Sequence, residues 1–180
     1  AIICKHSLFL RIYYRRKQLK LNIIRTILII ALITIFTTIF GFSNQDSETS
    51  GGISQKVTEY ITRHIPAIQR MEEFEKEEIT DKVETAIRKI AHFSIYTLVG
   101  ILLMSLMCTY KIKEIDKIGI SLIIGIIYAI SDEIHQSFIP GRGPQLTDVI
   151  LDSMGVLTGI FLTIFALEII RKFVNNKYAT

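Results

Sequence analysis

Four long apolar runs constrain this chain more than any other feature of its sequence. They lie at about 23–42, 87–108, 118–139 and 146–171. An α-helix rises about 1.5 Å per residue, so about 20 apolar residues are enough to cross the hydrocarbon core of a bilayer. Backbone N–H and C=O groups in lipid must be hydrogen-bonded within the protein, which favours helices over irregular chain. The runs therefore predict an all-α, multi-span integral membrane helix bundle with four transmembrane helices.

The charged residues that flank the runs predict how the helices are oriented. Residues 1–22 form a basic tail before the first run, and further basic residues follow the last run. The basic side chains of these two segments include Arg11, Arg15, Arg16, Lys17, Lys20, Arg171, Lys172 and Lys177. Because basic flanks stay on the cytoplasmic side, we expect a multi-pass protein of the cell membrane with both termini in the cytoplasm. The tail is then cytoplasmic, and residues 23–180 form the membrane domain.

The polar stretch at 43–86 then becomes a long outer loop. Apolar residues recur in it at helical spacing up to Pro66, and a glutamate-rich segment follows to about residue 86. These patterns predict amphipathic helices outside the membrane. The net charge of +4 does not indicate nucleic acid, because the basic residues flank apolar runs and do not form one face of a folded module. The partner that composition implies is the lipid bilayer.

The segment Ser131–Gly155 places ionisable side chains at the ends of membrane spans, where charge is costly. In four alternating spans, the first and third end on the outer side, and the second and fourth begin there. This topology brings the following polar residues to the outer end of the bundle: Ser43, Gln45, Lys89, His92, Tyr96, Asp132, Glu133, Gln136, Arg142, Asp148 and Asp152. Asp152 lies about 6 Å deeper than Asp148 by helix rise. At that depth we expect it to face a cavity or to pair with Lys89 or Arg142.

Three kinds of chemistry and one structural role fit these side chains. Carboxylates packed together repel, so one can keep its proton and act as an acid. His92 can be a general base oriented by an aspartate. A divalent metal is the third possibility, held by His92, Asp132, Glu133 and Asp148. Such an oxygen-rich set suits Mg²⁺, Mn²⁺ or Ca²⁺ better than Zn²⁺. The structural alternative is a buried network that locks the helix ends together. No spacing is diagnostic, so the metal and any cofactor stay unknown.

Short polar motifs follow one another in a specific order from about Phe42 to Gly159. They are Phe42-Ser43-x-Gln45, Arg88-Lys89-x-x-His92-Phe93-x-x-Tyr96, Tyr128-Ala129-x-x-Asp132-Glu133-x-His135-Gln136, Pro140-Gly141-Arg142 and Asp148-x-x-x-Asp152-x-x-Gly155. In this combination the chain resembles the VanZ-like family. The resemblance implies a small multi-span bacterial membrane protein. The family is named for a member associated with lowered susceptibility to teicoplanin, a glycopeptide antibiotic that carries a lipid chain.

Three functions stay open on the sequence alone. The first is to lower susceptibility to lipid-bearing glycopeptides through a polar pocket at the outer face, which contacts the drug, a lipid headgroup or a lipid-linked envelope precursor. The second is a membrane-embedded hydrolase or transferase that acts on a lipid-linked cell-envelope substrate. The third is a non-catalytic membrane scaffold. We expect catalytic roles for His92, Asp132, Glu133 and Asp148, and binding roles for Ser43, Gln45, Lys89, Tyr96, Gln136, Arg142 and Asp152.

Overall fold

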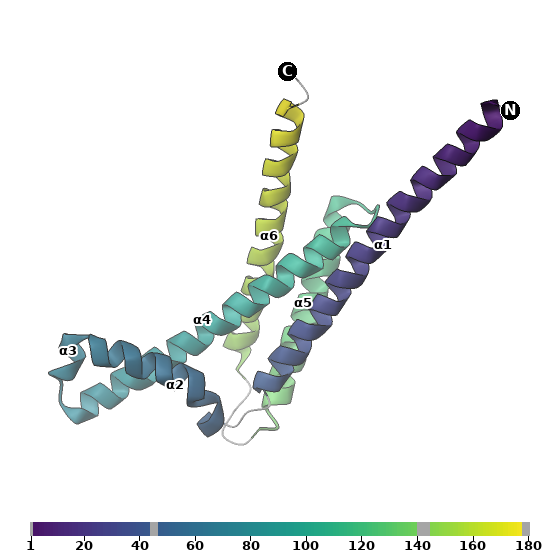
Figure 1. The fold of residues 1–180 in the computed structure, drawn as a ribbon. Coiled ribbons are helices and arrows are strands. Elements are labelled where there is room, and N and C mark those ends of the chain that lie inside the picture. The colour runs from purple at the N-terminus through teal and green to yellow at the C-terminus, as the bar shows by residue number, and fades with distance from the viewer. Residues whose placement is uncertain (1, 44–46, 140–144, 178–180) are drawn as a thin grey trace.

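The computed structural model describes residues 2–43, 47–139 and 145–177 (Figure 1). Every element in these ranges is an α-helix, in the order α1 (Ile2–Ser43), α2 (Ser47–His64), α3 (Pro66–Gln69), α4 (Glu73–Cys108), α5 (Glu114–Gln136) and α6 (Leu146–Lys177). The prediction of an all-α fold is confirmed. Helices α1, α4, α5 and α6 are long and apolar enough to cross a membrane. The chain is therefore a multi-pass membrane protein.

The helix boundaries differ from the predicted ones mainly at α4. The amphipathic segment expected at about 67–86 and the span expected at 87–108 are largely one continuous helix, which begins at Glu73. Residues 73–86 contain neither glycine nor proline, so no residue interrupts the helical hydrogen bonds where the sequence changes from polar to apolar. In the same way, the basic tail and the first span form the single helix α1.

The loop region expected outside the membrane forms a helical unit beside the first half of α4. Helix α2 packs against α4, and the short helix α3 follows it (Figure 1). Thr58 of α2 and Ile68 of α3 are buried in this unit. The amphipathic helices predicted within 43–86 are thus α2, α3 and the first turns of α4.

Helix α4 lies at the centre of the bundle and packs most closely against α6. Tyr96, Val99 and Leu103 of α4 share one buried core cluster with Val156 and Ile160 of α6. Helices α1 and α5 also pack against α4, and α5 packs against α6. This arrangement brings side chains from α1, α4, α5 and α6 together inside one bundle.

Glycines on α6 allow its close approach to α4. A Cβ atom at Gly155 would lie 2.7 Å from the carbonyl oxygen of Phe93, and one at Gly159 would lie 2.7 Å from the backbone nitrogen of Ile101. Both distances are too short for a carbon atom, so an alanine at either position would force the helices apart. The four-residue spacing of the two glycines is the one that membrane helices use for close backbone contact.

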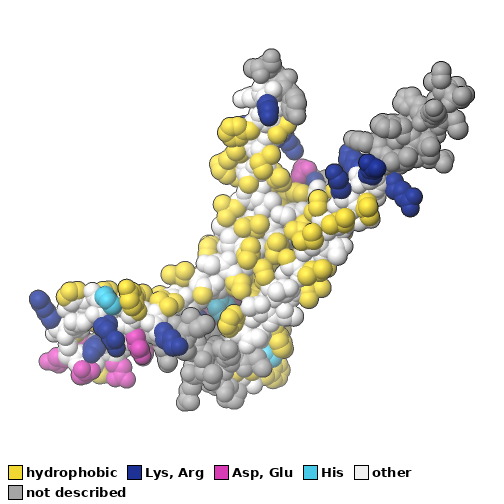
Figure 2. All heavy atoms as spheres, viewed as in Figure 1, with side chains coloured by type: hydrophobic (Ala, Val, Ile, Leu, Met, Phe, Trp, Pro, Cys, Tyr) yellow, Lys and Arg dark blue, Asp and Glu magenta, His cyan; other side chains and the backbone are white. Residues whose placement is uncertain are grey.

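Apolar side chains are spread over the membrane helices on the face that Figure 2 shows. Exposed large hydrophobic residues occur on each membrane helix, among them Ile30, Leu98, Ile127 and Phe165. Soluble monomers rarely expose apolar patches of this extent, whereas lipid tails favour such a surface. The surface therefore agrees with the length and hydropathy of the helices in indicating a membrane environment.

The two termini lie at the same end of the bundle, and the end of α5 and the start of α6 lie at the other (Figure 1). Four spans require this arrangement, because an even number of crossings returns the chain to the side on which it began. Arg25 of α1 is near the terminal end and donates hydrogen bonds to the hydroxyl and the carbonyl oxygen of Thr109, at 3.0 and 2.7 Å. Its guanidinium also lies 4.1 Å from the centre of the Tyr110 ring. These contacts hold α1 against the loop that follows α4.

Candidate functional site

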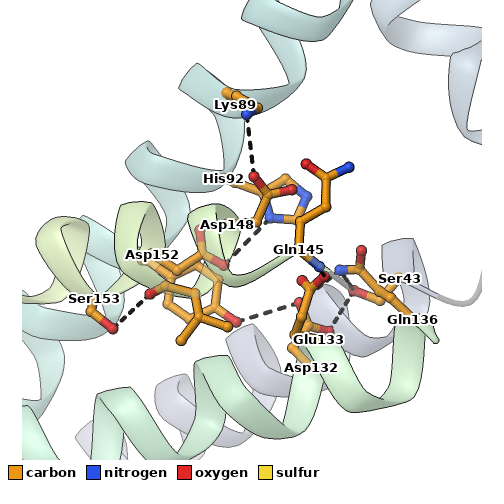
Figure 3. A network of polar contacts seen from close by, with 12 residues as sticks. Ser43, Lys89, His92, Asp132, Glu133, Gln136, Gln145, Asp148, Asp152 and Ser153 are labelled. Atoms are coloured by element: carbon orange, nitrogen blue, oxygen red, sulfur yellow. Dashed lines mark hydrogen bonds and ion pairs between the residues drawn. The ribbon is translucent and has the colours of Figure 1, made fainter. Parts of the chain in front are cut away.

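A group of polar side chains gathers at the end of the bundle opposite the termini (Figure 3). We call this group the polar cluster; it consists of Ser43 from α1, Lys89, His92 and Tyr96 from α4, Asp132, Glu133 and Gln136 from α5, and Asp148 and Asp152 from α6. The structure therefore brings together most of the residues for which the sequence predicts a role. Gln45 and Arg142 lie outside the described residues.

Helical spacing explains why these side chains meet. Residues three or four positions apart share one face of a helix. On α5 this places Asp132 and Gln136 side by side, and on α6 it does the same for Asp148 and Asp152. On α4, the corresponding face carries Lys89, His92 and Tyr96 at successive turns toward the core. Helices α4, α5 and α6 thus each direct one polar face toward the polar cluster.

Asp132 is the most highly connected side chain of the cluster. It is buried, with 4% of its surface exposed. Ser43 donates a hydrogen bond to its Oδ1 at 2.5 Å, and Gln136 donates to its Oδ2 at 3.1 Å. The Tyr96 hydroxyl lies 3.4 Å from the same Oδ2. These donors come from three helices, and hydrogen bonds to a charged group are worth about 1.5–3 kcal/mol each. Asp132 is therefore held in one orientation.

Asp152 is equally buried but far less well satisfied. Its Oδ2 lies 3.8 Å from Nδ1 of His92, which is too long for a hydrogen bond. Its Oδ1 is buried and has no hydrogen-bond partner among the described residues. Figure 3 shows the carboxylate of Asp152 pointing toward the His92 ring. The sequence led us to expect Asp152 beside Lys89, Arg142 or a cavity, and of these Lys89 pairs with Asp148 instead.

The rim of the cluster is more open than its centre. Nζ of Lys89 lies 3.3 Å from Oδ1 of Asp148, and the two side chains are 41% and 31% exposed. The side chain of His92 is 28% exposed and lies between this ion pair and the buried Asp152. An ion pair as exposed as Lys89–Asp148 adds only about 0–1 kcal/mol to stability. The pair therefore contributes little to holding the helices together.

Glu133 joins α5 to the start of α6. Its carboxylate accepts a hydrogen bond from the backbone N–H of Gln145, the residue directly before α6. Sequence reasoning missed Gln145, and no signal could have found it, because a backbone N–H is the same in every residue except proline. The contact keeps Glu133 occupied at the edge of the cluster.

Two pairs of stacked rings join α1 to α5 beside the cluster. The Tyr128 ring stacks on the Phe36 ring with 3.9 Å between centroids, and its hydroxyl donates to the Phe36 carbonyl oxygen at 2.6 Å. One turn further along α1, Phe40 stacks on His135 at 4.2 Å. His135 is therefore an aromatic packing residue and lies apart from the polar cluster.

A metal ion would find its donor atoms in a different set from the one predicted. Side-chain atoms of His92, Asp132 and Asp152 lie within 4.8 Å of one another. Glu133 and Asp148, which the sequence grouped with His92 and Asp132, have the partners described above, a backbone N–H and a lysine. Among the described residues, the atoms placed to share an ion are thus those of the partly exposed His92 and the buried Asp132 and Asp152, from α4, α5 and α6.

Comparison with known proteins gives one family and no individual relative. No curated protein and no solved structure matches the chain. A family model, VanZ/LLP1, matches residues 27–168. That range includes the four membrane helices in large part and every member of the polar cluster. The chain therefore belongs to the VanZ/LLP1 family.

Proposed function

We propose that this protein lowers the susceptibility of a bacterial cell to lipid-bearing glycopeptides such as teicoplanin, and that the polar cluster is the pocket through which it does so. The ligand is the polar head of a molecule whose lipid part lies in the outer leaflet: the drug itself or a lipid-linked envelope precursor. Family membership supports the biological setting, and the resemblance to VanZ supports the drug class.

The observation that carries this proposal is the gradient of exposure across the cluster. A half-exposed ion pair, Lys89–Asp148, lies at the rim, His92 is less exposed, and the Asp132 and Asp152 carboxylates are buried. A purely structural network would gain most from satisfying every buried atom, yet one oxygen of Asp152 lacks a partner. Groups of both charges, flanked by lipid-facing helices, suit the headgroup of an amphiphile.

The test is antibiotic susceptibility in a bacterium that lacks its own copy of such a protein. Expression of the wild-type chain should raise the inhibitory concentration of teicoplanin several-fold and leave that of a glycopeptide without a lipid chain nearly unchanged. Asp132→Asn and His92→Ala should each remove the increase while the amount of protein in the membrane stays at the wild-type level.

Asp116→Asn is a matched control for Asp132→Asn. It makes the same chemical change on the same helix, but in the first turn of α5, at the other end of the bundle from the polar cluster. It should keep the full increase. Should Asp132→Asn keep the increase as well, the cluster is not the pocket. Loss of Asp132→Asn and His92→Ala protein from the membrane would instead favour the scaffold role.

A second candidate function rests on the His92–Asp152 pair. A histidine beside a buried carboxylate is the usual arrangement of a general base, and it would suit a hydrolase or transferase acting on a lipid-linked envelope substrate. Purified protein incubated with a lipid-linked diphosphate precursor should then release a product, and His92→Ala should abolish the release. If folded wild-type protein leaves the precursor unchanged, this activity is excluded.

A further inference from the structure

We infer that His92, Asp132 and Asp152 form a binding site for one divalent transition-metal ion. The three residues come from α4, α5 and α6, so the ion would connect the three helices at the centre of the polar cluster. The inference concerns the site proposed above as a pocket and rests on that cluster being a binding site, but its test measures the metal alone.

The distances between the donor atoms favour a shared ion over direct pairing. All three donor atoms lie within 4.8 Å of one another, and the His92–Asp152 separation is 3.8 Å. Two ligand atoms bound to one ion at about 2.1 Å with a tetrahedral angle lie about 3.4 Å apart. The His92–Asp152 separation is too long for a hydrogen bond and close to this ligand-to-ligand distance. A pair at the upper limit of 4.8 Å would have to close by about 1.4 Å.

The second, independent observation is the unpartnered oxygen of Asp152. Its side chain is 4% exposed, and Oδ1 has no hydrogen-bond partner among the described residues. A buried polar group without a partner costs about 1–3 kcal/mol, and more if it is charged. A metal ion bound to this carboxylate removes that cost.

The surroundings of Asp132 resemble the outer shell of a metal site. Ligating carboxylates in proteins are usually hydrogen-bonded themselves, which fixes their orientation. Ser43, Gln136 and Tyr96 do this for Asp132. A carboxylate offers about four lone-pair positions, so these donors leave at least one for an ion.

The donor set indicates the class of ion. One imidazole with two carboxylates suits Mn²⁺, Fe²⁺ or Zn²⁺, whereas Ca²⁺ and Mg²⁺ prefer oxygen alone. Three protein ligands leave at least one coordination position for water or for an oxygen of a bound headgroup, such as a phosphate. Such a group would enter beside His92, which is 28% exposed, and the Lys89–Asp148 pair at the rim.

Mn²⁺ binding to the full chain in non-ionic detergent tests the inference directly. After treatment with a chelator and desalting, the protein is titrated with Mn²⁺, and free Mn²⁺ is measured from its electron paramagnetic resonance signal. We expect one Mn²⁺ per chain. Electron spin-echo modulation from a nitrogen nucleus should show that an imidazole is bound, and Zn²⁺ should displace the Mn²⁺.

Variants assign the ligands. His92→Ala should remove the nitrogen modulation, and Asp152→Asn, which preserves shape, should raise the Kd more than tenfold. Ser43→Ala removes the hydroxyl that donates to Asp132 and accepts from Gln136, and it should raise the Kd by about 10–100-fold. His135→Ala is the matched control: it removes a histidine at the same end of α5 that stacks on Phe40, and it should bind like the wild type. Circular dichroism and size-exclusion chromatography check that each variant is folded.

Two results would overturn the inference. One is folded wild-type protein that binds neither Mn²⁺ nor Zn²⁺ stoichiometrically. The other is nitrogen modulation that persists in folded His92→Ala protein. Because susceptibility and metal binding are measured separately, metal binding without any change in susceptibility would refute only the proposed function, and the converse would refute only the metal site.

Discussion

Replacing Gly159 with alanine should destabilise the bundle at the point where α6 lies closest to α4. The new Cβ atom would lie 2.7 Å from the backbone nitrogen of Ile101 and would overlap the carbonyl oxygen of Thr97. Both are backbone atoms within a helix, so neither can move as a flexible side chain would. The only way to make room is to shift α6 away from α4.

Two opposing effects determine how much Gly159→Ala changes the free energy of unfolding. Alanine in a helix interior is favoured over glycine by about 0.5–1 kcal/mol. Inserting a methyl group into a closely packed contact costs about 1–3 kcal/mol, and the rigid neighbours here place the cost in the upper part of that range. The net loss in the free energy of unfolding should therefore be roughly 1–2 kcal/mol.

Gly119→Ala provides the matched comparison. Gly119 is a helical glycine of α5, and a Cβ atom there would meet nothing within 4 Å. This variant should gain about 0.5–1 kcal/mol, so the two variants should differ by about 2 kcal/mol or more. Denaturation of the full chain in micelles, followed by far-ultraviolet circular dichroism, measures the difference. If both alanine variants are equally stable, the close α4–α6 contact described above is not present in the protein.

Three further predictions concern parts of the chain outside the polar cluster. Arg25→Ala should lower stability by about 3 kcal/mol in the same assay, because two charge-assisted hydrogen bonds to Thr109 are lost; full wild-type stability of Arg25→Ala would contradict these contacts. Tyr128→Phe should cost about 0.5–1.5 kcal/mol, since it removes the hydroxyl bound to the Phe36 carbonyl and keeps the stacked ring; full wild-type stability would speak against that hydrogen bond. In a chain whose two cysteines are replaced by serine, Lys177→Cys should be protected from a membrane-impermeant maleimide in intact cells and Glu59→Cys of α2 should react; the opposite pattern would show that the termini are outside.

The membrane helices and the convergence of polar residues could be predicted because each depends on a simple property of the sequence. A run of about 20 apolar residues is long enough to span a bilayer whatever its neighbours are. Once four spans alternate, the polar ends of the second, third and fourth must lie on one side. Asp132, Asp148 and His92 therefore had to be near one another before any packing was known.

The pairing within the cluster could not be predicted, because it depends on helix tilt and rotation at the scale of an ångström. Asp148 and Asp152 are one helical turn apart, and the sequence offers Lys89 to either. The close contact of α6 with α4 decides the choice by placing Asp148 beside Lys89 and Asp152 beside His92. The continuity of α4 was also missed, since the change from polar to apolar sequence looked like a boundary although no helix breaker lies there.

That continuity has a mechanical consequence. With 36 residues, α4 is about 54 Å long, whereas the hydrocarbon core of a bilayer is only about 30 Å thick. The helix is thus longer than one span needs, and α2 lies beside its first, polar part (Figure 1). Lys89 and His92 lie on α4, further along the same continuous helix, whereas Asp148 and Asp152 lie on α6. A force applied to α2 would therefore tilt one half of the cluster relative to the other and change the 3.8 Å gap between His92 and Asp152.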